Sequence, residues 1–219
     1  MKVLIIGAGG HSKVIVDIIQ SEKKYEIVGF IDNIQPIGKE VCGYKVIGRE
    51  EDIKTLTDNL NIYGGVIAVG DNFLRSNLEK KIKKLCNKFI FVNCLHPKSN
   101  IAFDVIMGEG NVVMAGATIN TSSEIGNHCI FNTNSSIDHD NKISNFVSIA
   151  PNAVTGGNVE IGAFSAIGIG STIIHNISVG ENCIVGASSL VHQDTISNSV
   201  YYGIPAKFIR EHKLGSKYL

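Results

Sequence analysis

Residues 161–178 read IGAFSA, IGIGST and IIHNIS, three six-residue units that each begin with isoleucine. The same spacing extends in both directions, from Ile101 to Val191. Fifteen of the sixteen residues at these positions, which we call the anchors, are large and apolar, and only Thr155 departs from the pattern. Because a missed repeat would misassign the whole fold, this period is the first feature to interpret.

A period of six residues excludes the common alternatives. An α-helix repeats near 3.6 residues, whereas a half-buried strand repeats near 2. Because six is a multiple of two, each unit can hold a short strand, and repeated units of strand and corner stack into a solenoid with one shared core. If three units close a triangular coil, residues 18 apart lie one above the other, and the sixteen units form about five coils. A β-sandwich is the alternative, but its loops vary in length.

Glycine directly follows seven of the anchors. We expect these glycines at tight corners, where a left-handed backbone favours glycine over other residues. They are Gly108, Gly126, Gly156, Gly162, Gly168, Gly180 and Gly186.

The first part of the chain predicts a nucleotide-binding type of α/β domain. An apolar run over residues 2–6 leads into GAGGH at 7–11, a helical pattern follows, and a second strand over 26–31 ends at Asp32. Glycines at such a turn let the backbone approach a phosphate at a helix N-terminus, and the acid can hold a ribose or a base. A glycine turn that only packs the helix on the strand is the structural alternative.

The nucleotide motif is incomplete for a dinucleotide, because position 12 is serine where GxGxxG needs glycine. About 95 residues also leave little room for both halves of a dinucleotide fold, so a mononucleotide or a nucleotide-sugar is the expected ligand. We therefore expect a Rossmann-like nucleotide-sugar-binding domain over 1–95. A β-helix domain with a C-terminal cap should follow over 96–219.

The composition excludes several classes of protein. The 219 residues include 20 basic and 20 acidic side chains, so the chain lacks the basic footprint of a nucleic-acid-binding protein. No apolar run approaches the length of a membrane span, and the N-terminus does not resemble a signal peptide. The five cysteines are scattered without CxxC spacing, which argues against a disulfide framework or zinc site and predicts a cytoplasmic protein.

The motifs together resemble one family. The repeat over 101–191 resembles the left-handed parallel β-helix of the hexapeptide-repeat acyltransferases. GAGGH, Asp32, NTNSSIDHD at 132–140, SIAP at 148–151 and YGIPAK at 202–207 narrow the resemblance to bacterial sugar acetyltransferases with an N-terminal nucleotide-sugar domain. This family includes N-acetyltransferases of nucleotide-linked 4-amino sugars and enzymes of the sialic acid O-acetyltransferase type, and the resemblance covers essentially the full chain.

Acetyl transfer from a thioester to an amine needs a base, and histidine suits that role near neutral pH. Four histidines lie within the repeat, and only His139 has an acid on each side, Asp138 and Asp140. The resemblance implies that His139 is the general base and that Asp140 raises its basicity. Because neighbouring residues on a strand point in opposite directions, a contact between these two side chains requires a bent backbone.

The resemblance also implies two ligand sites. Acetyl-CoA as co-substrate would contact Ser148, Ile169 and Ala187. The nucleotide-sugar would contact Gly9, Gly10, His11, Asp32 and Asn33. No metal is expected, because the four histidines of the repeat would be spread over several coils.

Subunit organisation follows from the spacing of these residues. Ile169 and Ala187 are 18 residues apart and therefore share a column, which lies on a different face of the helix from His139. A single subunit would not bring the two faces together, whereas neighbouring subunits could. We expect a homotrimer with active sites at the subunit interfaces, as the family resemblance also implies.

The expected function is acetyl-CoA-dependent N-acetylation of a nucleotide-linked 4-amino-4,6-dideoxy sugar, with UDP as the expected nucleotide, in bacterial surface-glycan or glycoprotein biosynthesis. O-acetylation of sialic acid or a related sugar is the alternative, in which the same base would activate a hydroxyl. A non-catalytic solenoid scaffold is a third possibility, and the Asp-His-Asp sequence argues against it.

Overall fold

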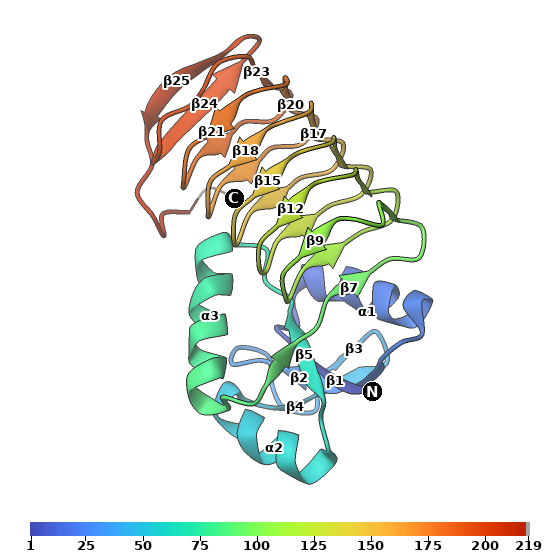
Figure 1. Cartoon of the computed structure of the whole chain (residues 1–219). Helices are drawn as coiled ribbons and strands as arrows, with labels where there is room; N and C mark the ends of the chain where they lie inside the picture. Colours follow the sequence, from blue (N-terminus) through green and yellow to red (C-terminus); the bar gives the residue numbers. More distant parts are fainter. Residues whose placement is uncertain (218–219) are drawn as a thin grey trace. The chain divides into compact units, whose positions relative to one another are not determined.

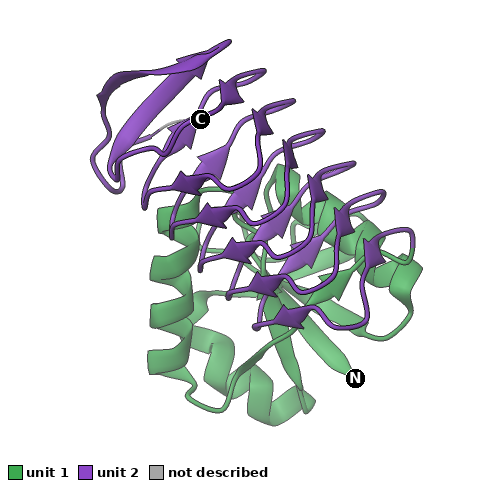
Figure 2. Cartoon of the chain, turned by 45° about the horizontal axis from the view of Figure 1, so that its top comes forward, with its two compact units in different colours: residues 1–97 green, residues 98–219 purple. Residues whose placement is uncertain are grey.

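The computed structural model describes residues 1–217, which form two compact units (Figure 2). Unit 1 comprises residues 1–97, and unit 2 begins at residue 98. No helix within the described residues is both long and apolar enough to cross a membrane.

Unit 1 is an α/β domain built on a six-stranded sheet with the strand order β3-β4-β2-β1-β5-β6 (Figure 1). Neighbouring strands are parallel except for the β3–β4 pair. The elements of unit 1 are β1 (Lys2–Ile6), α1 (Gly10–Glu22), β2 (Glu26–Ile31), β3 (Glu40–Val41), β4 (Tyr44–Gly48), η1 (Glu50–Asp52), α2 (Ile53–Leu60), β5 (Gly64–Ile67), α3 (Asn72–Leu85), β6 (Ile90–Phe91) and β7 (Cys94–Leu95).

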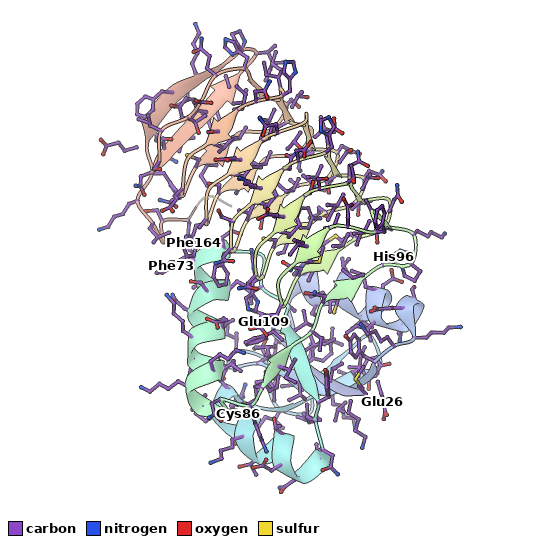
Figure 3. All side chains as sticks on the ribbon, viewed as in Figure 1. Glu26, Phe73, Cys86, His96, Glu109 and Phe164 are labelled. Atoms are coloured by element: carbon purple, nitrogen blue, oxygen red, sulfur yellow. The ribbon has the colours of Figure 1, made fainter. Side chains whose placement is uncertain are left out.

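The sequence of β1 is apolar at nearly every position because helices cover both faces of a parallel sheet. Val3, Leu4 and Ile5 are fully buried. Leu4 belongs to a core cluster with Ile31 of β2 and with Cys86, which directly follows α3 (Figure 3). The core holds the parallel strands β1, β2 and β5 side by side, so the loops after their carboxyl ends meet at one edge of the sheet, where α/β folds bind ligands.

Unit 2 is a three-sided parallel β-helix in which each side is a column of two-residue strands (Figure 1). Strands in a column pair in parallel at an offset of 18 residues, as in Thr118 with Ser136. Column A contains β8 (Asn100–Ile101), β11 (Thr118–Ile119), β14 (Ser136–Ile137), β17 (Val154–Thr155), β20 (Thr172–Ile173) and β23 (Leu190–Val191). Column B contains β9 (Ile106–Met107), β12 (Glu124–Ile125), β15 (Lys142–Ile143), β18 (Glu160–Ile161) and β21 (Ser178–Val179). Column C contains β10 (Val112–Val113), β13 (Ile130–Phe131), β16 (Ser148–Ile149), β19 (Ala166–Ile167) and β22 (Ile184–Val185).

The anchors fill the interior of the coils, as the six-residue period predicts. Ile119, Ile137 and Ile173 are fully buried, and each such side chain contributes roughly 1.5–3 kcal/mol to the free energy of folding. Beyond the last coil, β24 (Ser199–Gly203) pairs in parallel with β22, and β25 (Ala206–Glu211) returns antiparallel to β24. This hairpin is the C-terminal cap of the solenoid.

The corners correct one expectation from the sequence. The left-handed residue lies three positions after the anchor rather than one, and it is usually not glycine, since Asp140 and Asn158 have φ angles of 58° and 56°. The glycines that directly follow anchors are instead required by close packing between coils. A Cβ at Gly162, for example, would lie 2.5 Å from the backbone nitrogen of Glu181 in the next coil. The prediction that these glycines adopt a left-handed backbone is therefore wrong. They occur where neighbouring coils approach too closely for a side chain.

Candidate active site

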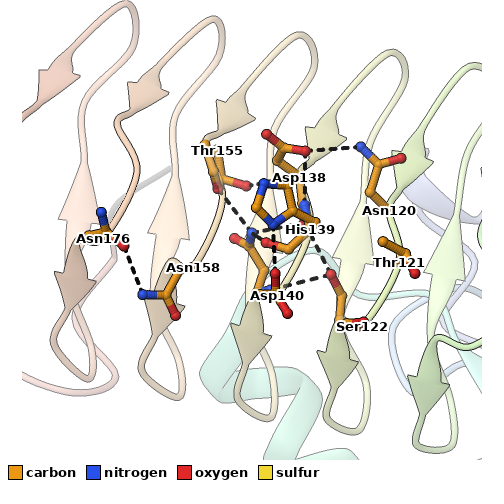
Figure 4. A network of polar contacts seen from close by, with 12 residues as sticks. Asn120, Thr121, Ser122, Asp138, His139, Asp140, Thr155, Asn158 and Asn176 are labelled. Atoms are coloured by element: carbon orange, nitrogen blue, oxygen red, sulfur yellow. Dashed lines mark hydrogen bonds and ion pairs between the residues drawn. The ribbon is translucent and has the colours of Figure 1, made fainter.

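The corner after β14 brings an imidazole and a carboxylate together (Figure 4). Asp140 adopts the left-handed conformation, and this bend turns its side chain back toward the preceding residue. The Nδ1 atom of His139 lies 2.6 Å from Oδ2 of Asp140, and 55% and 58% of the two side chains are exposed. Because a carboxylate only accepts hydrogen bonds, Nδ1 of His139 carries the hydrogen and Nε2 is left able to take a proton.

Asp138 orders the same corner from the other side. One of its carboxylate oxygens accepts hydrogen bonds from the backbone N–H of His139, at 2.9 Å, and from the side-chain amide of Asn120, at 3.2 Å. The backbone N–H of Asp138 donates to the hydroxyl of Thr155, at 3.3 Å. Thr155 is the one polar anchor of the repeat, so its departure from the pattern coincides with a contact to this corner.

The two carboxylates make His139 more basic. The hydrogen bond from Nδ1 to Asp140 raises the pKa of His139, and the charge of Asp138 raises it further. In turn, the hydrogen bond from the backbone N–H of His139 lowers the pKa of Asp138. The arrangement is one that orients an imidazole and stabilises its charged form.

A glycine in the next coil makes room for the imidazole. A Cβ at Gly157 would lie 2.5 Å from Cε1 and 2.6 Å from Nε2 of His139. Gly157 was not among the residues predicted from the sequence, although the pair Gly156-Gly157 in the repeat was a visible signal. The ring borders a cavity of about 400 Å³, which is lined by Asp138, His139, Gly156, Gly157, Asn158, His175 and Asn176.

The residues expected to contact acetyl-CoA lie along another edge of the solenoid. Pro151, Ile169 and Ala187 stack at successive corners after column C, joined by bonds such as Gly170 N–H to the Pro151 carbonyl, at 3.0 Å. Ile169 is 58% exposed, so the edge presents apolar surface to solvent. Ser148 lies on the face of column C, at the start of the strand that precedes the Pro151 corner.

Within one chain, this edge and the His139 edge are separated by the width of column A. Six residues of chain connect Ile169 to His175, which lies in the same corner column as His139. Extended chain of that length spans at most about 20 Å. The structure therefore brings Ile169 and Ala187 together, and it places His139 with Asp140 on a separate edge.

In unit 1, the glycine turn is open. Gly9 is the N-cap of α1 and has no side chain to cap the helix. A Cβ at Gly9 or Gly10 would meet no atom within 4 Å. The free N–H groups of the first helical turn therefore have space beside them, as an anionic ligand would need.

Asp32 already forms hydrogen bonds within the fold. Its Oδ2 accepts from the backbone N–H of Ala8, at 2.6 Å, and its Oδ1 accepts from those of Ile34 and Gln35, at 2.7 and 2.8 Å. Partial burial works to raise the pKa of Asp32, but these backbone N–H groups outweigh it and lower the pKa overall. Asp32 thus fixes the glycine turn against the loop after β2.

Asn33 is likewise tied to its surroundings, since its side-chain oxygen accepts a hydrogen bond from the backbone N–H of Glu50, at 3.1 Å. A cavity of about 300 Å³ lies beside Asp32 and Asn33 at the carboxyl ends of the strands. It is lined by Ile6, Gly7, Ile31, Asp32, Asn33, Ile34, Glu50, Val69, Leu74, Asn77, Leu78 and Lys81.

His11 is neutral in the folded protein. Burial, together with the nearby charge of Arg75, lowers its pKa from 6.5 to about 4. Nε2 of His11 is buried without a hydrogen-bond partner among the described residues. Arg75, which no sequence motif pointed to, is only 1% exposed and donates to the carbonyls of Val69 and Gly70, at 3.0 and 2.9 Å.

Acid should destabilise the protein through His11. The unfolded chain binds a proton on this imidazole near pH 6.5, whereas the folded chain does so only near pH 4. The unfolded state holds more protons between these values, so the free energy of unfolding falls as the pH falls from 6.5 toward 4, by up to roughly 3 kcal/mol. Urea unfolding at about pH 7 and about pH 4.5 measures this loss, which should be smaller in His11→Asn. Equal losses in the two proteins would contradict the prediction.

The described residues of the two units do not form a cluster of metal ligands. No group of three or more histidine, cysteine, aspartate or glutamate side chains within residues 1–217 is placed to hold a metal ion.

Comparison with known proteins identifies both units. Residues 2–82 match the family model described as the PglD N-terminal domain. The chain is 27% identical over 188 residues to the GDP-perosamine N-acetyltransferase of Escherichia coli O157:H7, covering 84% of this chain and 82% of that protein.

Solved structures match over nearly the whole chain. PerB from Caulobacter crescentus, in complex with CoA and GDP-perosamine, is 31% identical with a TM-score of 0.89, covering 96% of this chain and 98% of that one. The acetyltransferase domain of PglB from Neisseria gonorrhoeae, in complex with acetyl coenzyme A, is 32% identical with a TM-score of 0.88, covering 95% and 98%. The predicted α/β domain followed by a left-handed parallel β-helix is confirmed, and the chain belongs to the bacterial sugar acetyltransferases that combine a PglD-type N-terminal domain with a hexapeptide-repeat β-helix.

Proposed function

We propose that this enzyme transfers the acetyl group of acetyl-CoA to the amine of a nucleoside-diphosphate-linked 4-amino-4,6-dideoxy sugar, with His139 as general base. Among its relatives are N-acetyltransferases of nucleotide-linked amino sugars, and CoA or acetyl-CoA is bound in solved relatives. The observation that carries the assignment of the base is the 2.6 Å contact between Nδ1 of His139 and Asp140.

The reaction follows from that contact. As the neutral amine attacks the thioester carbonyl, Nε2 of His139 takes the proton that the nitrogen loses, and Asp140 stabilises the resulting imidazolium. The carbon–sulfur bond then breaks, and the thiolate leaves with the proton from His139. The imidazole returns to its starting state, and the acetyl group passes directly to the acceptor without an acyl-enzyme.

The open turn at Gly9 and Gly10 would receive the diphosphate, with neutral His11 beside it. Asp32 and Asn33 border the 300 Å³ cavity that would accept the nucleoside. Because the carboxylate of Asp32 accepts three backbone N–H bonds, we assign it the role of shaping this cavity as well as lining it. Acetyl-CoA would lie along Ile169 and Ala187, with Ser148 near its path.

We propose further that the enzyme is a homotrimer whose active sites lie between subunits. The outward residues of column A are uncharged, and all except the exposed Asn100 are half-buried, among them Thr118, Val154 and Thr172. Column B instead exposes Glu124, Lys142 and Glu160. Uncharged surface is typical of the centre of an interface. Packing of column A between subunits would bring the His139 edge of one subunit to the Ile169 edge of the next.

A substrate panel tests the proposed function. Purified enzyme is incubated with acetyl-CoA and 4-amino-4,6-dideoxyhexoses linked to GDP, UDP or dTDP, with sialic acid and the non-aminated nucleotide-sugars as controls. Mass spectrometry should find an N-acetylated nucleotide-sugar and CoA, and the preferred nucleotide identifies the base that unit 1 recognises. Acetylation of sialic acid alone, or of no acceptor at all, would overturn the proposal.

A further inference from the structure

The corner that carries His139 contains an unusual buried amide. The residue four positions after the anchor points into the solenoid and is small at most corners, as at Ser165 and Ser171, which are fully buried. At the catalytic corner this residue is Asn141, which is also fully buried. A polar side chain inside the coil stabilises the fold only if hydrogen bonds satisfy it, so the partners of Asn141 show what it does.

The amide of Asn141 is bonded mainly to its own corner. Its Nδ2 donates to the carbonyl oxygens of Asp138, at 2.8 Å, and His139, at 3.0 Å. It also reaches the carbonyl of Gly156 in the next coil, at 2.9 Å. Three carbonyl acceptors around one NH₂ group fix which end of the amide is nitrogen. The two local bonds hold the backbone on both sides of His139.

Serine at the same position makes a simpler contact. The hydroxyl of Ser165 donates to the carbonyl of Gly180, fifteen residues on, at 2.8 Å, and Ser171 donates to Gly186 in the same way, at 2.7 Å. A hydroxyl has one hydrogen to donate, so it can make the bond between coils but cannot also bind two carbonyls of its own corner. The bonds to Asp138 and His139 therefore depend on an amide.

We propose that Asn141 is a positioning residue of the active site, which holds the imidazole of His139 and the carboxylate of Asp140 in contact. The proposal rests on the assignment of His139 as the base. The His139 carbonyl belongs to the planar peptide group that joins His139 to Asp140, so its direction sets the rotation on both sides of that group. Two backbone hydrogen bonds between coils also restrain this peptide group. The N–H of Asn158 donates to the His139 carbonyl, at 2.9 Å, and the N–H of Asp140 donates to the Thr121 carbonyl, at 3.1 Å. Equivalent bonds recur at other corners, and Asn141 adds the restraint that the catalytic corner requires.

The chain supplies its own control. Asn111 is fully buried at the equivalent position of a corner after column B, away from the His139 edge. Its Nδ2 donates to the carbonyls of Gly108, at 3.1 Å, and Gly126, at 2.9 Å, and its Oδ1 accepts from the N–H of Cys129, at 2.7 Å. Oδ1 of Asn141, by contrast, is buried without a hydrogen-bond partner among the described residues. A change at Asn111 therefore removes a buried amide with similar donor bonds to its own corner and the next coil, without touching the catalytic corner.

The test compares Asn141→Ser with Asn111→Ser in the full-length enzyme. Serine retains the bond between coils and loses the local bonds. Both variants should melt at similarly reduced temperatures. Asn141→Ser should lower kcat about tenfold or more with little change in KM, because a small displacement of a catalytic group costs rate rather than binding. Asn111→Ser should retain kcat within about twofold.

Titration of His139 separates positioning from general stability. Its imidazole NMR signal is assigned by its absence in His139→Asn. In Asn141→Ser the pKa of His139 should fall toward the ordinary histidine value, since its contact with Asp140 loosens, and the pH–rate profile should move with it. In Asn111→Ser the pKa should equal that of the unaltered enzyme.

Equal kcat values for Asn141→Ser and Asn111→Ser, with an unchanged His139 pKa, would overturn the proposal. Should the serine variant fail to fold, Asn141→Ala serves instead, because Ala117 and Ala153 occupy this position at other corners and alanine has no side-chain donor. The NMR titration reports the contact between His139 and Asp140 even if His139→Ala proves active. An error in the assignment of the base can therefore be distinguished from an error in the positioning role of Asn141.

Discussion

Replacement of His139 by alanine should lower kcat by about 10²- to 10⁴-fold, the usual contribution of a general base. The change removes the only atom of this corner, Nε2, that we assign to proton transfer. KM for both substrates should change much less, because neither ligand needs the imidazole for most of its binding contacts. Steady-state kinetics with the acceptor identified by the panel measures the effect. Near-normal turnover would remove His139 from the role.

His175→Ala is the matched control for this variant. His175 is also exposed and lies in the same corner column, two coils further on, but aspartates do not flank it in the sequence. Its loss should reduce kcat far less than the loss of His139. A comparable reduction would show that the cavity, rather than the Asp138-His139-Asp140 corner, determines the rate.

The pH dependence provides an independent check of the same corner. His139 must be neutral to act as a base, so kcat/KM should rise with pH through its pKa, and this rise should lie above the ordinary histidine value because Asp140 and Asp138 raise the pKa. Asp140→Asn should move the rise to lower pH while lowering its plateau. A rise at the same pH in both proteins would contradict the role of Asp140.

Two inactive variants should restore activity together. His139→Ala removes the base, and Ala187→Trp places a large side chain on the exposed edge proposed for acetyl-CoA. In a trimer with shared sites, every mixed trimer contains one interface where an intact His139 edge meets an intact Ala187 edge. Random co-assembly of equal amounts should therefore give about a quarter of the unaltered activity, from two proteins that are each nearly inactive.

The control for this mixing experiment combines two variants that are both altered at the His139 edge. Co-expression of His139→Ala with Asp140→Asn leaves no interface with an intact catalytic corner, so activity should not exceed that of Asp140→Asn alone. If the active site were contained within one subunit, the first mixture would also stay inactive. Analytical ultracentrifugation of each variant should find the proposed trimer.

The sequence predicted the fold of unit 2 well because the signal is repeated. Each anchor, such as Ile161, packs into the same core with the same geometry, so a single departure such as Thr155 does not hide the period. The nucleotide-binding type of unit 1 was predicted from one glycine turn and the acid after β2. Neither signal specified that Asp32 accepts a hydrogen bond from the backbone of Ala8, because this contact follows from how two separate loops fold together.

The sequence by itself determined the solenoid and the glycine turn, and it singled out His139 as the candidate base, because each of these signals is encoded by residues near one another in the chain. Only the tertiary structure decided that the contact between His139 and Asp140 forms, since it needs the left-handed backbone at Asp140. The same holds for the space above Gly157 and for the neutral state of His11, which depend on residues brought close from other coils or helices. Spacing predicts which residues share a column, whereas backbone bends and burial by distant segments determine which side chains touch and which can hold a proton.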